Sequence, residues 1–203
     1  MKTTTEASGI YDQITKKWSW QDVSWTKDEH TGMYVSNRIY PDEFWNRKWS
    51  KKNNTAGVIL LKKHKDSFKI LVVQCYNNKF GFPKGTCDSF ETFEDAAKRE
   101  LREELGIILD FDLNSIPDTH IIENKHPNQN LRKIRNSAHV RKVKFFVLVV
   151  PEDFEINSFP SKGLGDVEIT KFGWIDINKL NNYEISHLAK QTYNQLQEII
   201  KIK

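Results

Sequence analysis

The sequence predicts an α+β fold, in which helices pack on a mixed β-sheet, preceded by a short N-terminal extension. Two apolar segments near the middle of the chain, 56–61 and 68–76, have the composition of buried strands in one sheet. An amphipathic helix with clear start and stop signals follows them, and further strands precede a last helix. This mixed order of elements favours α+β layering.

The composition indicates one full-sized globular domain. With 203 residues the chain can bury a core, but two independent domains are not expected. The two cysteines, Cys75 and Cys87, are too few for a disulfide framework, so we expect a reducing, cytoplasmic location. The longest apolar run ends at Pro151 and is too short to span a membrane. A formal net charge of +4 favours a polyanionic partner.

The boundary between the extension and the main domain is predicted at residues 53 and 54, which assigns 1–53 to the extension and 54–203 to the domain. A short helix is expected from Pro41, with Trp45 and Trp49 four residues apart on one face. The extension holds five of the six tryptophans: Trp18, Trp20, Trp25, Trp45 and Trp49. They are either core residues of the extension or a stacking surface for a methylated guanine, whose positive charge suits an indole face.

Segments 56–61 and 68–76 are joined by a polar turn, and a glycine-bearing loop over 80–89 leads to the best-defined helix. Thr92 is the expected N-cap and Gly106 the expected end. Its apolar face carries Phe93, Ala97, Leu101 and Leu105. Further strands are expected at 119–123, 140–150 and 171–177. The last helix is amphipathic through Leu188, Tyr193, Leu196, Ile199 and Ile200.

The helix over 92–106 gathers carboxylates. At about 100° of rotation per residue, Glu100, Glu103 and Glu104 fall within an arc of roughly 100° that overlaps the edge of the apolar stripe. Crowded anions on a half-buried face need protons, basic partners or a metal, and oxygen ligands suit Mg²⁺ or Mn²⁺. The alternative is a solvated glutamate-rich face on which Arg99 pairs with Asp95 and Glu103 at helical spacing.

The spacing of the motif extends beyond the helix. Its fixed positions are Gly85, five residues, Glu91, seven residues, Arg99-Glu100-Leu101, one residue, Glu103-Glu104, one residue, and Gly106-Ile107. This pattern resembles the complete motif of Nudix hydrolases. The resemblance implies a mixed sheet sandwiched between helices, and attack by a water activated by Mg²⁺ or Mn²⁺ on a phosphorus of a nucleoside diphosphate linked to another group.

The same resemblance assigns roles by position. Glu100, Glu103 and Glu104 become metal ligands, and Glu91 becomes a supporting or additional ligand. Arg99 becomes the residue that orients the glutamates, while Gly85 serves the loop. Glu104 is one candidate for the base that removes a proton from the attacking water.

Two flanking segments are similar to mRNA decapping enzymes of this family. Residues 80–85, Phe-Gly-Phe-Pro-Lys-Gly, resemble the loop that precedes the motif in those enzymes, and residues 166–169, Asp-Val-Glu-Ile, with the later Trp174, resemble the segment that follows it. Glu168 then becomes the second candidate base or an extra metal ligand. Lys84 is expected to contact phosphate, or is otherwise an exposed loop lysine. A Pro-Lys-Gly loop also occurs in Nudix enzymes that hydrolyse dinucleoside polyphosphates.

A basic stretch over 125–144 includes Arg132, Lys133 and Arg135 and carries no acidic residue. It is expected to hold an RNA backbone through phosphate contacts, or is a solvated basic loop. The leading prediction is therefore an enzyme that releases 7-methyl-GDP from capped RNA and leaves a 5′-monophosphate. Compact decapping enzymes of large DNA viruses resemble the chain in architecture, which would place it in a host cytoplasm. The alternatives are a dinucleoside or diphosphoinositol polyphosphate hydrolase and a non-catalytic RNA-binding module.

Overall fold

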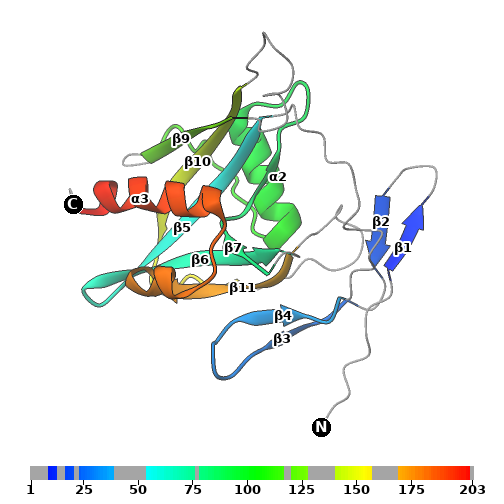
Figure 1. The fold of residues 1–203 in the computed structure, drawn as a ribbon, viewed down its shortest axis with the longest axis horizontal. Helices are drawn as coiled ribbons and strands as arrows, with labels where there is room; N and C mark the ends of the chain where they lie inside the picture. The colour runs from blue at the N-terminus through cyan, green and yellow to red at the C-terminus, as the bar shows by residue number, and fades with distance from the viewer. Residues whose placement is uncertain are drawn as a thin grey trace.

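A mixed β-sheet forms the centre of the protein in the computed structural model (Figure 1). The structure describes residues 9–12, 17–20, 23–38, 54–75, 78–116, 120–127, 140–156 and 169–201. Within these ranges nine strands join one sheet in the order β3-β4-β11-β6-β5-β10-β9, with β7 on β6 and β8 on β5. Strand β10 runs parallel to β5, and the other strand pairs of this sheet are antiparallel. The strands are β3 (Trp25–Lys27), β4 (Tyr34–Ser36), β5 (Thr55–His64), β6 (Ser67–Cys75), β7 (Phe80–Gly81), β8 (Lys84–Thr86), β9 (His120–Pro127), β10 (Val140–Val150) and β11 (Ile169–Asp176).

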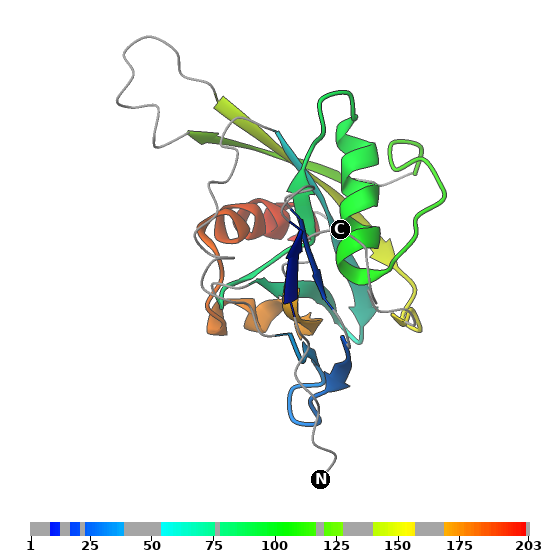
Figure 2. The ribbon, with the colours of Figure 1, turned by 90° about the vertical axis from the view of Figure 1, so that its right-hand side faces the viewer.

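Helices cover both faces of this sheet. Strand β5 alternates, so that Val58 and Leu60 pack with helix α2 (Phe93–Leu105) while Ile59 and Leu61 pack with helix α3 (His187–Lys201). Figure 2 shows the sheet between the two helices. Each fully buried aliphatic side chain contributes about 1.5–3 kcal/mol relative to exposure. The predicted α+β fold, a mixed sheet sandwiched between helices, is confirmed.

Helix α2 has the ends that its sequence predicts. The Thr92 hydroxyl accepts a hydrogen bond from the Asp95 backbone N–H at 3.1 Å, and Gly106 adopts the left-handed conformation at φ 68°. Both groups satisfy backbone positions that a helix leaves open at its ends. The apolar face also forms as predicted, since Ala97, Leu101 and Leu105 are buried.

The loop over 80–89 differs from its prediction because it contains two short strands. Residues 84–86 of β8 pair with residues 55–57 of β5. Gly57 permits this close approach, since a Cβ there would lie 2.2 Å from the Pro83 carbonyl oxygen. The polar turn between β5 and β6 is also shorter than predicted. Only Lys65 and Asp66 form it, and Lys65 has a positive φ of 53°.

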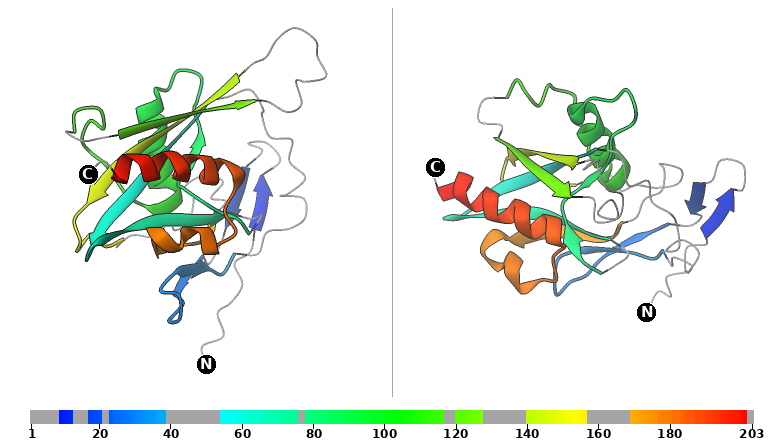
Figure 3. Two further views of the ribbon diagram at one scale, coloured as in Figure 1. Left: turned by 60° about the vertical axis from the view of Figure 1, so that its left-hand side comes forward. Right: turned by 45° about the horizontal axis from the view of Figure 1, so that its top comes forward.

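The N-terminal part of the chain contributes strands that the sequence pattern did not predict. Strands β1 (Gly9–Asp12) and β2 (Lys17–Trp20) pair with each other, while β3 and β4 extend the main sheet beside β11. Figure 3 shows β3 and β4 at the opposite end of the sheet from β9. The helix expected from Pro41, with Trp45 and Trp49, lies outside the described residues.

Trp25 is half-buried and packs against the main core from this sheet extension. Its ring meets Phe172 of β11 edge to face at 5.1 Å, and Tyr34 stacks on the same Phe172 ring at 5.2 Å. This packing supports the interpretation of Trp25 as a core residue. The side chains of Trp18 and Trp20 are not among those described.

The C-terminal elements close the second face. A 3₁₀ helix, η2 (Ile177–Asn182), leads to α3, where Tyr193 and Leu196 are buried. The Tyr193 hydroxyl donates to the Ile177 carbonyl at 2.8 Å, and the Asn124 amide of β9 donates to the Thr192 hydroxyl at 2.9 Å. Among the described helices, none is long and apolar enough to cross a membrane.

Candidate active site

The site is built where α2 lies against β8. Glu104, only 9% exposed, accepts a hydrogen bond through Oε2 from the Lys84 backbone N–H at 3.2 Å. The Glu100 carboxyl group lies against Gly85, where a Cβ would come within 1.9–2.1 Å of its atoms. Because β8 is anchored on β5, the carboxylate face of α2 is fixed to a loop far from it in the sequence.

Arg99 gathers three of the glutamates. Its guanidinium donates to both oxygens of Glu91 at 2.8 and 2.9 Å and to the Thr86 carbonyl at 2.8 Å. Its Nη1 atom also donates to Glu100 Oε1 at 2.8 Å and to Glu103 Oε2 at 3.1 Å. Bonds of this charge-assisted, forked kind define orientation as well as strength. The arrangement is that expected of a residue that orients the glutamates.

The alternative pairing of Arg99 with Asp95 is wrong. Asp95 Oδ2 instead accepts a hydrogen bond from the Thr92 hydroxyl at 2.6 Å and completes the start of the helix. Arg99 is therefore free to point along the helix toward Glu103, as helical spacing allows, and across to Glu91.

Burial and neighbouring positive charge shift the pKa values of the carboxylates in opposite directions. The hydrogen bonds from Arg99 hold the pKa of Glu91 below its usual value. Burial raises the pKa of Glu100, and the charges of Arg99 and Lys84 only partly oppose that effect. The glutamates in turn raise the pKa of Arg99, so its positive charge is permanent. By formal charge, the four glutamates and the two cations Arg99 and Lys84 leave 4 − 2 = 2 negative charges in the cluster.

The cluster has donor atoms that suit a divalent cation. Within the described part of the chain, Glu100 Oε2 and Glu103 Oε1 accept no hydrogen bond. Hard carboxylate oxygens of this kind are the ligands preferred by Mg²⁺ and Mn²⁺. The described residues contain no group of three or more acidic, histidine or cysteine side chains already arranged around one point. Three of the carboxylates, Glu91, Glu100 and Glu103, are paired with Arg99 instead. By their chemistry the residues fit a cation, which Glu100, Glu103 and Glu104 would hold with Glu91.

Several predicted site residues fall outside the described ranges. These are the candidate base Glu168 and the basic residues Arg132, Lys133 and Arg135. The nearest described neighbour of Glu168 is Ile169, which is fully buried and whose carbonyl oxygen accepts a hydrogen bond from Arg38 Nη1 at 3.4 Å.

The two ends of the basic stretch belong to strands β9 and β10, which pair with each other. Lys144 is therefore not a loop residue. Its ammonium group lies 3.0 Å from Glu123 Oε1 and 5.3 Å from the centre of the Phe93 ring. Lys142 is exposed. Part of the predicted basic surface is thus already engaged within the protein.

Sequence reasoning missed two supports of α2. The Thr86 carbonyl that anchors Arg99 is a backbone group, which any residue type provides. Glu94 accepts hydrogen bonds from the Leu113 N–H at 2.8 Å and from the Asn114 side chain, and pairs with Lys98 at 2.6 Å. It thereby ties the segment after α2 to the start of the helix. In the sequence, only the four-residue spacing of Glu94 and Lys98 could have indicated one of these contacts, their ion pair.

The site thus consists of a carboxylate-bearing helix set against a lysine–glycine loop on a mixed sheet. The chain belongs to the Nudix family, because the family model described as NUDIX domain matches residues 51–196. It is accordingly an enzyme that acts on nucleoside diphosphate derivatives. Nudix hydrolases generally use divalent metals such as Mg²⁺ or Mn²⁺.

Solved structures share this fold. A Nudix hydrolase from M. smegmatis, RenU, superposes with a TM-score of 0.54 at 13% identity, covering 88% of this chain and 96% of that one. An Ap4A hydrolase from C. elegans gives 0.53 at 14% identity, covering 74% and 99%. The NUDIX domain of Shewanella oneidensis NrtR, complexed with ADP ribose, gives 0.51 at 14% identity, covering 80% and 99%. No curated protein matches the chain significantly. At these identities the likeness concerns the fold alone.

Proposed function

We propose that this Nudix hydrolase removes the 5′ cap of mRNA, releasing 7-methyl-GDP and leaving RNA with a 5′-monophosphate. The observation that carries the proposal is the attachment of the Phe80–Gly85 loop to the carboxylate cluster, through the 3.2 Å hydrogen bond from Lys84 N–H to Glu104. The sequence of this loop resembles that of decapping enzymes, and the bond holds the Lys84 backbone against Glu104. A diphosphate held at the cluster would then meet Lys84.

Each residue of the cluster has a distinct task in this chemistry. A divalent cation held by the glutamates would neutralise phosphate oxygens and make hydroxide available near neutral pH. Lys84 contributes a positive charge to the phosphate. Arg99 positions Glu91, Glu100 and Glu103 through the bonds described above. Glu104 or Glu168 accepts the proton of the attacking water.

Capped RNA is favoured over a small nucleotide by the distribution of basic residues. Strands β9 and β10 carry the ends of the basic stretch, and Lys142 on β10 is exposed. Arg132, Lys133 and Arg135 belong to the same stretch of sequence and would add phosphate contacts to an RNA chain. The resemblance to compact decapping enzymes of large DNA viruses supports the same proposal and would place the enzyme in a host cytoplasm.

A second candidate is hydrolysis of dinucleoside or diphosphoinositol polyphosphates. The Pro83-Lys84-Gly85 sequence favours it equally, because the same loop occurs in Nudix enzymes with dinucleoside substrates. The C. elegans structure is named as an Ap4A hydrolase, but at 14% identity it cannot choose between the substrates. A non-catalytic RNA-binding role is disfavoured, since a cluster of anions beside RNA would weaken binding.

The test is a comparison of substrates. The protein is incubated with Mg²⁺ and cap-labelled RNA, free cap dinucleotide or diadenosine tetraphosphate, and the products are identified. We expect labelled 7-methyl-GDP from capped RNA at a higher kcat/KM than from either dinucleotide. Cleavage of the dinucleotides alone would replace decapping by the second candidate, and binding of RNA without cleavage of any substrate would support the binding module.

A further inference from the structure

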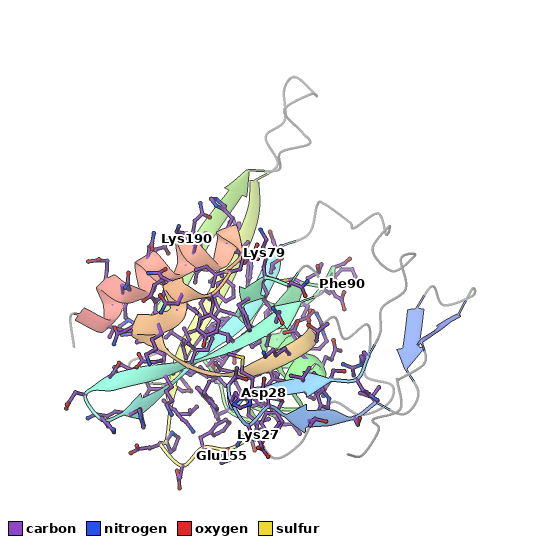
Figure 4. The ribbon with its side chains drawn as sticks, turned by 60° about the horizontal axis from the view of Figure 1, so that its bottom comes forward. Lys27, Asp28, Lys79, Phe90, Glu155 and Lys190 are labelled. Carbon is purple, nitrogen blue, oxygen red and sulfur yellow. The ribbon has the colours of Figure 1, made fainter. Side chains whose placement is uncertain are left out.

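The turn before α2 carries an aromatic ring that lies wholly in solvent. The Phe90 side chain is 103% exposed, whereas the other exposed large hydrophobic side chains of the described residues are 38–71% exposed. Figure 4 shows the labelled Phe90 at the edge of the side chains drawn as sticks. A ring in this position adds nothing to the buried core, because its apolar surface stays in water in the folded chain.

The turn that presents Phe90 is fixed to the carboxylate cluster. The Glu91 N–H donates to the Asp88 carbonyl at 3.1 Å, and the Asp88 N–H donates to Glu91 Oε2 at 3.1 Å. Both oxygens of Glu91 also accept hydrogen bonds from Arg99. Phe90 is thus one residue from a member of the cluster, about 3.8 Å away between Cα atoms, and its backbone is held by the same network.

We propose that Phe90 is a specificity-determining residue whose ring stacks on the nucleobase of the substrate. The inference rests on the proposed function in one respect, that the reacting diphosphate lies at the glutamates. A nucleobase is joined to its phosphate through a single ribose, and the Phe90 backbone adjoins Glu91 of the carboxylate cluster. A base whose phosphate is held at the cluster would therefore lie within reach of this turn. Stacking would cover the exposed face of Phe90. Because the turn is already held in place, binding would not have to meet the entropy cost of ordering it.

Stacking on Phe90 predicts an order of binding affinity among ligands. Every nucleobase has a π face, so the contact tolerates different bases. A 7-methylguanine carries a positive charge, which the electron-rich face of a phenylalanine ring attracts further. The site is therefore expected to bind 7-methyl-GDP more tightly than GDP, and GDP more tightly than pyrophosphate, which has no base.

The experiment measures binding of these three probes to the full chain in Mg²⁺ by isothermal titration calorimetry. Phe90→Leu keeps an apolar side chain without an aromatic face, and Phe90→Tyr keeps the face. We expect Phe90→Leu to weaken GDP binding about fivefold to 100-fold, with pyrophosphate unchanged, and Phe90→Tyr to bind as wild type. The melting temperature should stay constant, because the ring makes no core contact. Ile108→Ala, at another exposed apolar residue, should leave all three affinities unchanged.

Equal losses for GDP and pyrophosphate in Phe90→Leu would overturn the inference, and so would an unchanged affinity for GDP. Wild-type protein that binds GDP no more tightly than pyrophosphate would overturn it as well. These measurements involve neither RNA nor turnover. Failure to remove the cap from RNA would therefore refute decapping while leaving the stacking of nucleotides on Phe90 to be judged from the binding data.

Discussion

Gly85→Ala tests the contact between the β8 loop and the catalytic helix. A Cβ at this position would lie 1.9 Å from Glu100 Cδ and 2.0 and 2.1 Å from its two oxygens. Real Cβ atoms essentially never come closer than 3.0 Å to another heavy atom, so the carboxyl group must move by at least 3.0 − 1.9 = 1.1 Å. That movement disrupts the 2.8 Å bond between Arg99 and Glu100.

The expected result is loss of activity with little loss of stability. A misplacement of about 1 Å in a catalytic group costs on the order of 100-fold in rate. The folded chain loses one charge-assisted hydrogen bond, roughly 1.5–3 kcal/mol, and the glycine-to-alanine change restores about 0.4–1 kcal/mol through the unfolded state. The net loss of about 0.5–2.6 kcal/mol should lower the melting temperature by roughly 1–10 °C.

Two other glycines provide controls. A Cβ at Gly81 would meet only Ser186 Oγ at 3.7 Å, an ordinary contact, so Gly81→Ala should keep both rate and melting temperature. A Cβ at Gly57 would lie 2.2 Å from the Pro83 carbonyl, where backbone cannot yield, so Gly57→Ala should unfold the protein. The measurements are kcat on capped RNA and diadenosine tetraphosphate, and thermal unfolding. A Gly85→Ala enzyme with the wild-type rate, or one as unstable as Gly57→Ala, would refute the reasoning.

Further predictions concern the metal, the base and the RNA. Glu104→Gln should abolish turnover and keep the fold, because it is nearly isosteric but removes a charge needed to hold metal. Circular dichroism checks the fold and rate measurements check turnover. Activity near wild type would contradict the assignment of Glu104 as a metal ligand. EDTA should stop the reaction and Mg²⁺ or Mn²⁺ restore it, whereas full activity in chelator would exclude the metal-based mechanism. Replacing Arg132, Lys133 and Arg135 together by alanine should weaken binding to long capped RNA and flatten its salt dependence while sparing dinucleotide hydrolysis; equal losses on both substrates would indicate damage to the site. Glu168→Gln should lower kcat with little change in RNA affinity. It should alter the acidic limb of the pH–rate profile more than the alkaline limb. An unchanged rate on capped RNA would leave Glu104 or another glutamate of the motif as the base.

The sequence by itself determined those helices and strands whose signals depend on residues close together in the chain. Thr92 and Gly106 define the ends of α2 because capping depends on neighbours in the chain. The unbroken apolar run over 56–61 predicts a strand buried on both faces, and the 3.6-residue period places the glutamates along the edge of the apolar face of α2. These predictions needed no knowledge of what packs against the elements.

Tertiary structure decided the contacts between distant segments. Periodicity could not choose between Asp95 and Glu91 as the partner of Arg99, because Glu91 precedes the helix and its position depends on the turn at Asp88. The pairing of β8 with β5, and of β4 with β11, depends on backbone hydrogen bonds that any sequence can make. Lys62 shows the same limit, since its charge predicts exposure while its ammonium is buried against the Phe154 carbonyl and the Trp174 ring. The spacing of the motif over 85–107, with its resemblance to the Nudix motif, therefore identifies the chemistry of the site. Burial and strand pairing, which arise only when the sheet assembles, set its geometry.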